Sequence, residues 1–232
     1  MTVAFDHLPS KLTLCPRLVL AYKPSMGGTM MRKLQFALFL LMTLAIADFA
    51  VQGAAQGQVN YYPMKEGSKW YYHTELPGTD AQTWIMHVAK LEKIDGVPLF
   101  RLEMTKKDSG MTATEHLRIG DDGVFRYRFN GQPASKPVCV IKYPVKPGET
   151  WQNETEIGGQ KVKMSSKVGN EEEVAVPAGK FKTMPVYVQA DLGGLNMNTT
   201  YWFAANVGIV KQVVEFMGQK VTQSLEKYEA AK

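Results

Sequence analysis

The chain contains few of the residues that build the commonest catalytic and metal sites. Two cysteines and four histidines occur among its 232 residues, and their spacing matches neither a disulfide framework nor a zinc site. The G-x-S-x-G, Walker, H-E-x-x-H and C-x-x-C motifs are all absent. The sequence therefore predicts no metal, no cofactor and no catalytic residue, and the protein is expected not to be an enzyme.

Long apolar runs are also scarce. The longest covers the fourteen residues Leu34–Ala47, which is shorter than the roughly twenty that a membrane-spanning helix needs. The remaining composition, 45% hydrophobic and 21% charged, is typical of a globular domain and excludes wholesale disorder.

Residues 30–55 have the organisation of a bacterial secretory signal peptide. A pair of cations precedes the apolar run Leu34–Ala47, and small residues follow it. We favour cleavage after Ala55, which leaves a polar mature terminus, with cleavage after Ala47 as the alternative. An uncleaved anchor or a buried helix is the other interpretation. The mature protein is expected to be exported, either periplasmic or secreted, and no cysteine follows the run to carry a lipid anchor.

Residues 1–29 fit no part of a signal peptide, which normally begins within a few residues of its cations. We interpret this segment as a disordered extension that results from a start codon placed too early, with Met30 or Met31 as the true start. The alternative is a genuine long n-region.

Loss of the leader changes the charge of the protein. Residues 1–55 hold five cations and two anions, so their removal lowers the net charge from +5 to +2. A chain this close to neutral, with positive and negative charges interspersed, lacks the excess of positive charge that nucleic-acid binding requires. Cys139 is then the only thiol, so no internal disulfide is expected in an exported fold that must be held together by packing.

Residues 58–232 have the pattern of a single all-β domain. Short runs rich in β-branched and aromatic residues alternate with turn signals such as Asp95-Gly96. Between Lys161 and Val168 apolar and lysine residues alternate, which places apolar side chains inward and charged ones outward. The same rule predicts that Phe125 faces inward and Arg126 outward.

We expect an antiparallel meander of about ten to twelve strands that curls into a barrel or half-barrel, because curling hides the sheet edges. The last residues, 224–232, are the only helical candidate in this domain, and they are equally compatible with a strand and a frayed tail.

A nine-residue motif, Tyr-Pro-x-Lys-x-Gly-x-x-Trp, occurs twice, at Tyr62–Trp70 and at Tyr143–Trp151. In each copy the proline favours an extended start, the glycine permits a tight turn, and the tryptophan is placed to fill the core as a strand begins. The two copies indicate either a duplicated half or two uses of one structural device.

Two further motifs, Val176–Thr183 and Tyr201–Lys211, complete a set that resembles the TapB-like family of exported bacterial β-rich domains of unknown function. The resemblance extends from about Tyr61 to Tyr228. The family usually has Pro-Gly where this chain has Ala205-Asn206, so the turn there is expected to differ in shape. The resemblance implies a β-rich exported fold and no established activity.

These motifs also have an architectural meaning of their own. Pro177 ends one strand and Gly179 turns the chain into the next, as in a β-arch. Gly208 permits a bend where the last hairpin begins. Trp202 and Phe203, as neighbours on one strand, must face opposite sides of the sheet, with one in the core and the other partly exposed.

The aromatic and methionine content is the one indication of a ligand. Trp84 and Met86 share a strand face, and Trp202 lies on another strand, so a barrel lined by them could accept an apolar ligand. The alternative is that these side chains fill the barrel themselves.

Three functions follow from this pattern. The leading one is a non-catalytic exported module that binds an unidentified apolar ligand or an envelope component. The second is a periplasmic carrier or chaperone for a lipid or another apolar ligand. The third is a hydrolase of the envelope or of polysaccharides, with acids brought together from distant strands.

The start of translation is directly testable. Peptide mass spectrometry of the native precursor should find no peptide that begins before Met30, because translation is expected to start at Met30 or Met31. Any peptide from residues 1–29 contradicts the shorter start.

Overall fold

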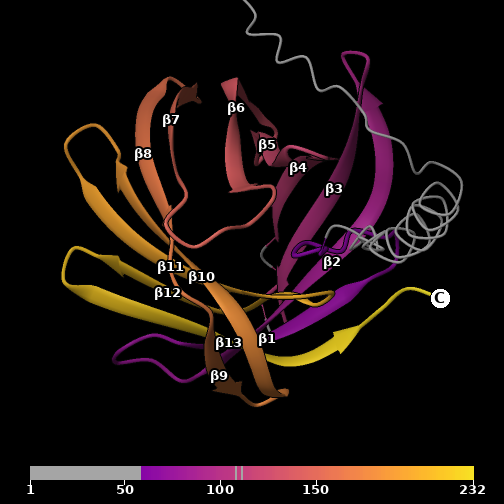
Figure 1. Cartoon of the computed structure of the whole chain (residues 1–232), viewed down its shortest axis with the longest axis vertical. Helices are drawn as coiled ribbons and strands as arrows, with labels where there is room; N and C mark the ends of the chain where they lie inside the picture. Colours follow the sequence, from indigo (N-terminus) through magenta and orange to yellow (C-terminus); the bar gives the residue numbers. More distant parts are fainter. Residues whose placement is uncertain (1–58, 108, 111) are drawn as a thin grey trace, which may run out of the picture. The chain divides into compact units, whose positions relative to one another are not determined.

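The computed structural model describes residues 59–107, 109–110 and 112–232, and within them thirteen strands form one sheet (Figure 1). The predicted extension and signal peptide lie outside these residues. The strands are β1 (Lys69–Glu75), β2 (Gln82–Ile94), β3 (Val97–Lys106), β4 (Thr112–Gly120), β5 (Gly123–Phe129), β6 (Gln132–Lys142), β7 (Thr150–Ile157), β8 (Gln160–Val168), β9 (Glu172–Val176), β10 (Gly179–Asp191), β11 (Asn196–Ala204), β12 (Gly208–Phe216) and β13 (Gln219–Glu229). Within the described part of the chain no helix is long and apolar enough to cross a membrane.

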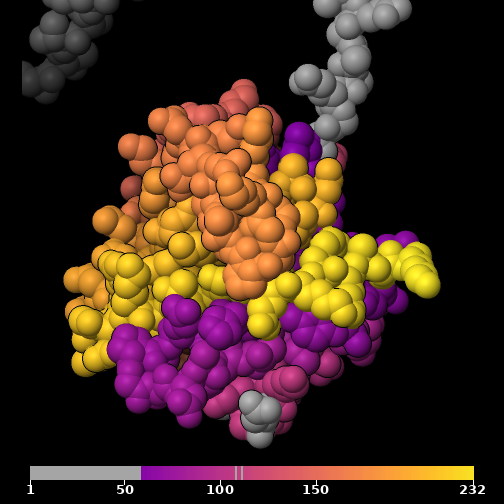
Figure 2. Space-filling model, turned by 90° about the horizontal axis from the view of Figure 1, so that it is seen from below, coloured from indigo at the N-terminus to yellow at the C-terminus, as the bar shows by residue number. Residues whose placement is uncertain are grey.

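The sheet closes into a barrel. Neighbouring strands are antiparallel, and the last strand, β13, pairs with the first along Lys69–Glu75. Figure 2 shows the same closure from outside, with the C-terminal residues in yellow lying against the N-terminal strands in indigo. One edge of β10 pairs with β8 and β9, which lie end to end, and the other edge pairs with β11. The ring therefore contains twelve strands, with β9 as an extra one.

These observations confirm the predicted all-β antiparallel barrel. The tail from Ser224 to Glu229 belongs to β13 and pairs with β1, so it is a strand and not a helix. In β8 the alternation of apolar and lysine residues predicts the side-chain orientations correctly, because Val168 is buried and Lys167 is exposed.

The predicted orientations of Phe125 and Arg126 in β5 are wrong. Val124 is fully buried and Arg126 faces the barrel interior, whereas Phe125 lies under the guanidinium of Arg118, 4.7 Å from its ring centroid. Arg126 is in phase with the buried Val124, so it shares the inner face. Both neighbouring ladders skip Tyr127, and this bulge reverses the alternation, so that Phe129 again lines the interior.

The segment before β1 fills one end of the barrel. Tyr62 is buried against Phe203, with ring centroids 6.0 Å apart. Trp70 stacks on Tyr228 at 5.0 Å and donates a hydrogen bond from Nε1 to the carbonyl of Val207 at 2.6 Å. An aromatic core therefore closes this end, whereas the hairpins at the other end of the barrel carry no such segment in the described part of the chain.

Both copies of the nine-residue motif have the same backbone geometry. Gly67 N–H donates to the carbonyl of Val88 at 2.9 Å, and Gly148 N–H donates to that of Val168 at 2.9 Å. Both glycines have a positive φ, 90° and 82°, a backbone conformation that residues with a side chain rarely adopt. The copies lead into β1 and β7, which lie six strands apart in the ring of twelve, and this arrangement favours the duplicated-half interpretation.

The junction between β6 and β7, here called the seam, is the weak point of the ring. A single ladder pair, Ala134 with Ile157, joins these strands in the described structure. Elsewhere along the seam the side chain of Asn153 replaces the missing backbone partner: it accepts from the N–H of Cys139 at 2.9 Å and donates to its carbonyl at 3.0 Å. Trp151 Nε1 donates to the same carbonyl at 3.0 Å.

Proline contributes to the lack of a ladder at the seam. Pro133 and Pro137 lie in β6, and neither can donate a backbone hydrogen bond. Further side-chain bonds across the seam join Thr155 to Lys136 and Ser135 to Glu156. The barrel is therefore continuous, but part of its circumference is held by side chains.

Replacement of Asn153 by Leu should destabilise the protein by about 1–3 kcal/mol, because the N–H of Cys139 loses its side-chain acceptor. The carbonyl of Cys139 loses one of two donors and keeps the bond from Trp151 Nε1. Urea unfolding of the exported protein measures this change. Gln152→Ala is the matched control, because the neighbouring side chain is exposed and makes no hydrogen bond within the described residues; it should change stability by less than about 0.5 kcal/mol. Equal effects of the two replacements would contradict the role given to Asn153.

Candidate functional site

A cavity of about 350 Å³ lies inside the barrel. Its lining comes from nine strands and from the segment before β1, which places it within the ring. The lining residues are Tyr62, Tyr72, Trp84, Ile85, Met86, Met104, Glu115, Arg126, Phe129, Val140, Met197, Tyr201, Ile209, Gln212 and Gln223.

One side of the cavity is apolar. Met86 and Met104 are direct cross-strand partners, and Trp84 lies two residues from Met86 on the same face of β2. Met197 and Phe129 contribute from β11 and from the end of β5. Methionine side chains are unbranched and polarisable, so a wall made of them adapts to the shape of an apolar ligand.

The other side is polar and contains an ion pair. Arg126 Nη2 lies 3.0 Å from Glu115 Oε1, and the two side chains are 24% and 10% exposed. The Nε atom of Arg126 is buried and has no hydrogen-bond partner. Gln212 and Gln223, which face each other across β12 and β13, complete this side.

Burial and the ion pair set the charge states here. Burial alone would lower the pKa of the Arg126 guanidinium, but the Glu115 carboxylate raises it above its usual value. Burial raises the pKa of Tyr62 well above its ordinary value, and Glu115 raises it further. Burial also raises the pKa of Tyr201, against an opposing effect of Arg126. Both phenols are therefore neutral hydrogen-bonding groups at physiological pH.

Neither charged residue of the cavity was among the residues that the sequence pattern pointed to. Glu115 alternates with Ala113 and Leu117 on the inner face of β4. A carboxylate among apolar residues of one strand face was therefore the sequence feature that could have identified it. Arg126 gave no such signal, because the aromatic residues around it pointed to the opposite orientation and the bulges of β5 are not visible in its composition.

The structure brings together two of the three predicted ligand residues. Trp84 and Met86 line the cavity, with Met86 at 8% exposure. Trp202 faces outward, where its Nε1 donates to the Glu172 carboxylate and Lys211 Nζ lies 5.3 Å from its ring centroid. It is remote from the cavity because its neighbour Phe203 takes the inner face of β11.

The residues predicted as structural lie in turns, in the core and at the seam. Trp70 is in the core and Trp151 is at the seam. Pro177 and Gly179 flank the β9–β10 turn, where Ala178 N–H donates to the carbonyl of Leu225 at 2.9 Å and so docks the turn on β13. Gly208 has a φ of 100° and lies beside Trp70.

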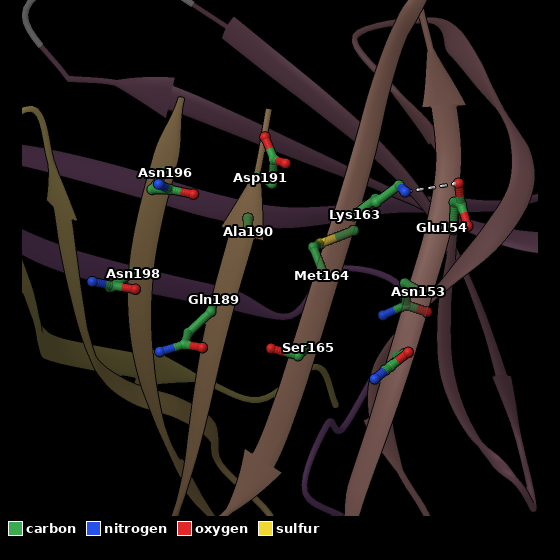
Figure 3. Close-up of a pocket in the computed structure, with 11 residues that line it drawn as sticks. Asn153, Glu154, Lys163, Met164, Ser165, Gln189, Ala190, Asp191, Asn196 and Asn198 are labelled. Carbon is green, nitrogen blue, oxygen red and sulfur yellow. Dashed lines mark ion pairs between the residues drawn. The ribbon is translucent and has the colours of Figure 1, made fainter. Parts of the chain in front are cut away.

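A second hollow, of about 750 Å³, lies on the outer face of β7, β8, β10 and β11 (Figure 3). Cross-strand register arranges its exposed side chains in two rows. The rows are Gln152, Ser165, Gln189 and Asn198, and Glu154, Lys163, Asp191 and Asn196. We call this hollow the outer groove.

The outer groove contains two carboxylates but no surroundings suited to acid catalysis. Glu154 lies 3.6 Å from Lys163 Nζ, and Asp191 accepts a hydrogen bond from Gly194 N–H at 2.6 Å. Both are exposed, so neither lies in the desolvated surroundings that are typical of a general acid. The interior cavity, with its buried ion pair, is therefore the stronger candidate for a functional site.

Other reactive groups do not gather into a site. No three His, Cys, Asp or Glu side chains of the described residues cluster in a way that could hold a metal ion. His116 Nε2 lies 2.8 Å from Glu92 Oε1. Burial raises the pKa of the Cys139 thiol to about 11, so little of it is the reactive thiolate at neutral pH.

Comparisons with known proteins leave the function open. No family model matches the chain, and no curated protein matches it. The chain is similar to a solved structure from Parabacteroides distasonis named as a lipoprotein (12% identity, 75% of this chain, all of that chain, TM-score 0.49). It is also similar to a Bacteroides fragilis protein named as exported with a YmcC-like fold (15% identity, 74% of this chain, all of that chain, TM-score 0.46). A third similar structure is the hypothetical lipoprotein YmcC of Escherichia coli (11% identity, 90% of this chain, all of that chain, TM-score 0.36).

At these identities and TM-scores the likeness supports no inference about function. None of the comparisons names the TapB-like family, so that resemblance remains a prediction.

The ion pair can be tested by a double-mutant cycle. Arg126→Met should destabilise the protein by about 3 kcal/mol, because the Glu115 carboxylate is left unpaired in the cavity. Combined Glu115→Leu and Arg126→Met should restore most of the loss, because no charge then remains buried. Unfolding free energies in urea give both values.

The outward pair Arg101–Glu103, 3.0 Å apart and 36% exposed at each side chain, supplies the control. Arg101→Met should cost less than about 1 kcal/mol. A double variant at the inner pair that is no more stable than Arg126→Met would contradict this account of the pair.

Proposed function

We propose that the protein is an exported, non-catalytic binding protein that holds a small amphiphilic ligand inside its barrel. The observation that supports this most is the interior cavity, which has an apolar wall at Trp84, Met86 and Met104 and a polar wall at Glu115 and Arg126. Small-molecule sites in proteins usually combine apolar surroundings with a few convergent polar groups.

The size of the cavity fits this role. Its volume of about 350 Å³ lies within the range of roughly 300–1,000 Å³ for small-ligand pockets. A water molecule takes up about 30 Å³, and a methylene group takes up a similar volume. The cavity therefore has room for an amphiphile of about eleven or twelve non-hydrogen atoms, head group included.

An interior site favours a carrier over a module that binds an envelope component through its surface. The third possibility, a hydrolase, has less support, because the carboxylates of the outer groove are exposed and each is engaged with a neighbouring group. Export, to the periplasm or outside the cell, follows from the predicted signal peptide.

Binding can be measured with N-phenyl-1-naphthylamine, a neutral fluorophore that brightens in apolar surroundings. Its fluorescence should rise on titration into the exported protein. Met104→Trp should weaken binding about ten-fold or more, because the larger side chain occupies the apolar side of the cavity.

His87→Trp is the matched control, since His87 adjoins Met86 on β2 but faces outward. It should leave the affinity within about two-fold of its original value. An organic extract of the native protein should also contain bound lipid in mass spectrometry. Absence of both fluorophore binding and bound lipid would overturn the proposal.

A further inference from the structure

The charges that line the cavity cancel. Glu115 and Arg126 are the only charged side chains among its described lining residues, and they form one ion pair. The remaining polar lining groups belong to Trp84, two glutamines and three tyrosines. The tryptophan and glutamine side chains carry no charge, and burial raises the pKa of the Tyr62, Tyr72 and Tyr201 phenols, so these are neutral as well. A ligand therefore meets a polar wall without net charge.

This wall still has hydrogen-bonding capacity to offer. Arg126 Nε is buried without a partner, and the hydroxyl groups of Tyr62 and Tyr201 take part in no hydrogen bond within the described residues. The second oxygen of Glu115 is available as an acceptor, since one oxygen takes the bond from Arg126. A matching head group must accept from Arg126 or a phenol and donate to Glu115.

A charged head group is poorly suited to this arrangement. A carboxylate near Arg126 would also lie near Glu115, because the two groups are 3.0 Å apart, so repulsion offsets the attraction. The carboxylate would still lose its hydration on entering the cavity, and the pair would not compensate for that loss. An uncharged hydroxyl or amide incurs a much smaller desolvation cost and satisfies both partners.

We propose that the cavity selects amphiphiles with an uncharged hydroxyl- or amide-bearing head group and that Glu115 excludes carboxylates. This inference rests on the proposed function, because it assigns the ligand class of the same site. Arg126 and Glu115 thereby act as specificity determinants.

Displacement of N-phenyl-1-naphthylamine by three ten-carbon ligands tests this selectivity. The ligands are 1-decanol, decanoate and decylammonium, each kept below its aggregation limit at pH 7.5. The wild-type protein should bind 1-decanol at least ten-fold more tightly than either ion.

Glu115→Gln should raise the affinity for decanoate at least ten-fold, because the charge of Arg126 is then uncompensated. Arg126→Gln should raise the affinity for decylammonium by a similar factor, and it provides a second test should the first variant fail to fold. Glu103→Gln, which removes an outward carboxylate on the adjacent strand β3, should change none of the three affinities.

Wild-type protein that binds decanoate as tightly as 1-decanol would overturn the inference, as would a decanoate affinity that Glu115→Gln leaves unchanged. Failure of the proposed function has a different signature, since neither the fluorophore nor any of the three ligands would then bind to the wild-type protein.

Discussion

Closure of the sheet is the constraint on which the rest of the structure depends. An open meander of this length would expose two strand edges, and the pairing of β13 with β1 removes them. Eight strands enclose a space that side chains just fill, and the diameter grows with strand number. A ring of twelve is therefore too wide to be filled along its whole length, and the cavity follows from the strand count.

Closure also explains why a charged pair can lie inside an otherwise apolar barrel. Next to the aromatic core at one end, the ring is wider than its side chains can span, and the space is bordered by Arg126, Glu115 and several neutral polar groups. Charges taken out of water must be paired, and the 3.0 Å contact between the two side chains meets this need. The same pairing leaves the cavity without net charge.

The sequence was sufficient to predict the architecture, because that depends on local signals: alternation in β8, Asp-Gly at the β2–β3 turn, and the two copies of the nine-residue motif. It was also sufficient to place Trp84 and Met86 on one face of a strand. It could not predict the orientations along β5, where Arg126 is in phase with Val124 and a bulge at Tyr127 returns Phe129 to the inner face. Such a bulge arises from pairing between strands and is not visible in the sequence of one strand. The seam could not be predicted either, because the hydrogen bonds between Asn153 and Cys139 depend on which strands lie next to each other in the folded barrel.

A crystal structure of the exported protein under xenon pressure tests most directly whether the barrel is hollow. Xenon occupies apolar cavities that are otherwise empty or filled with weakly held solvent. We predict xenon density against Trp84, Met86 and Met104, or density for a retained ligand in the same place. Side chains that pack against one another across this space, with neither xenon nor ligand between them, would contradict the account.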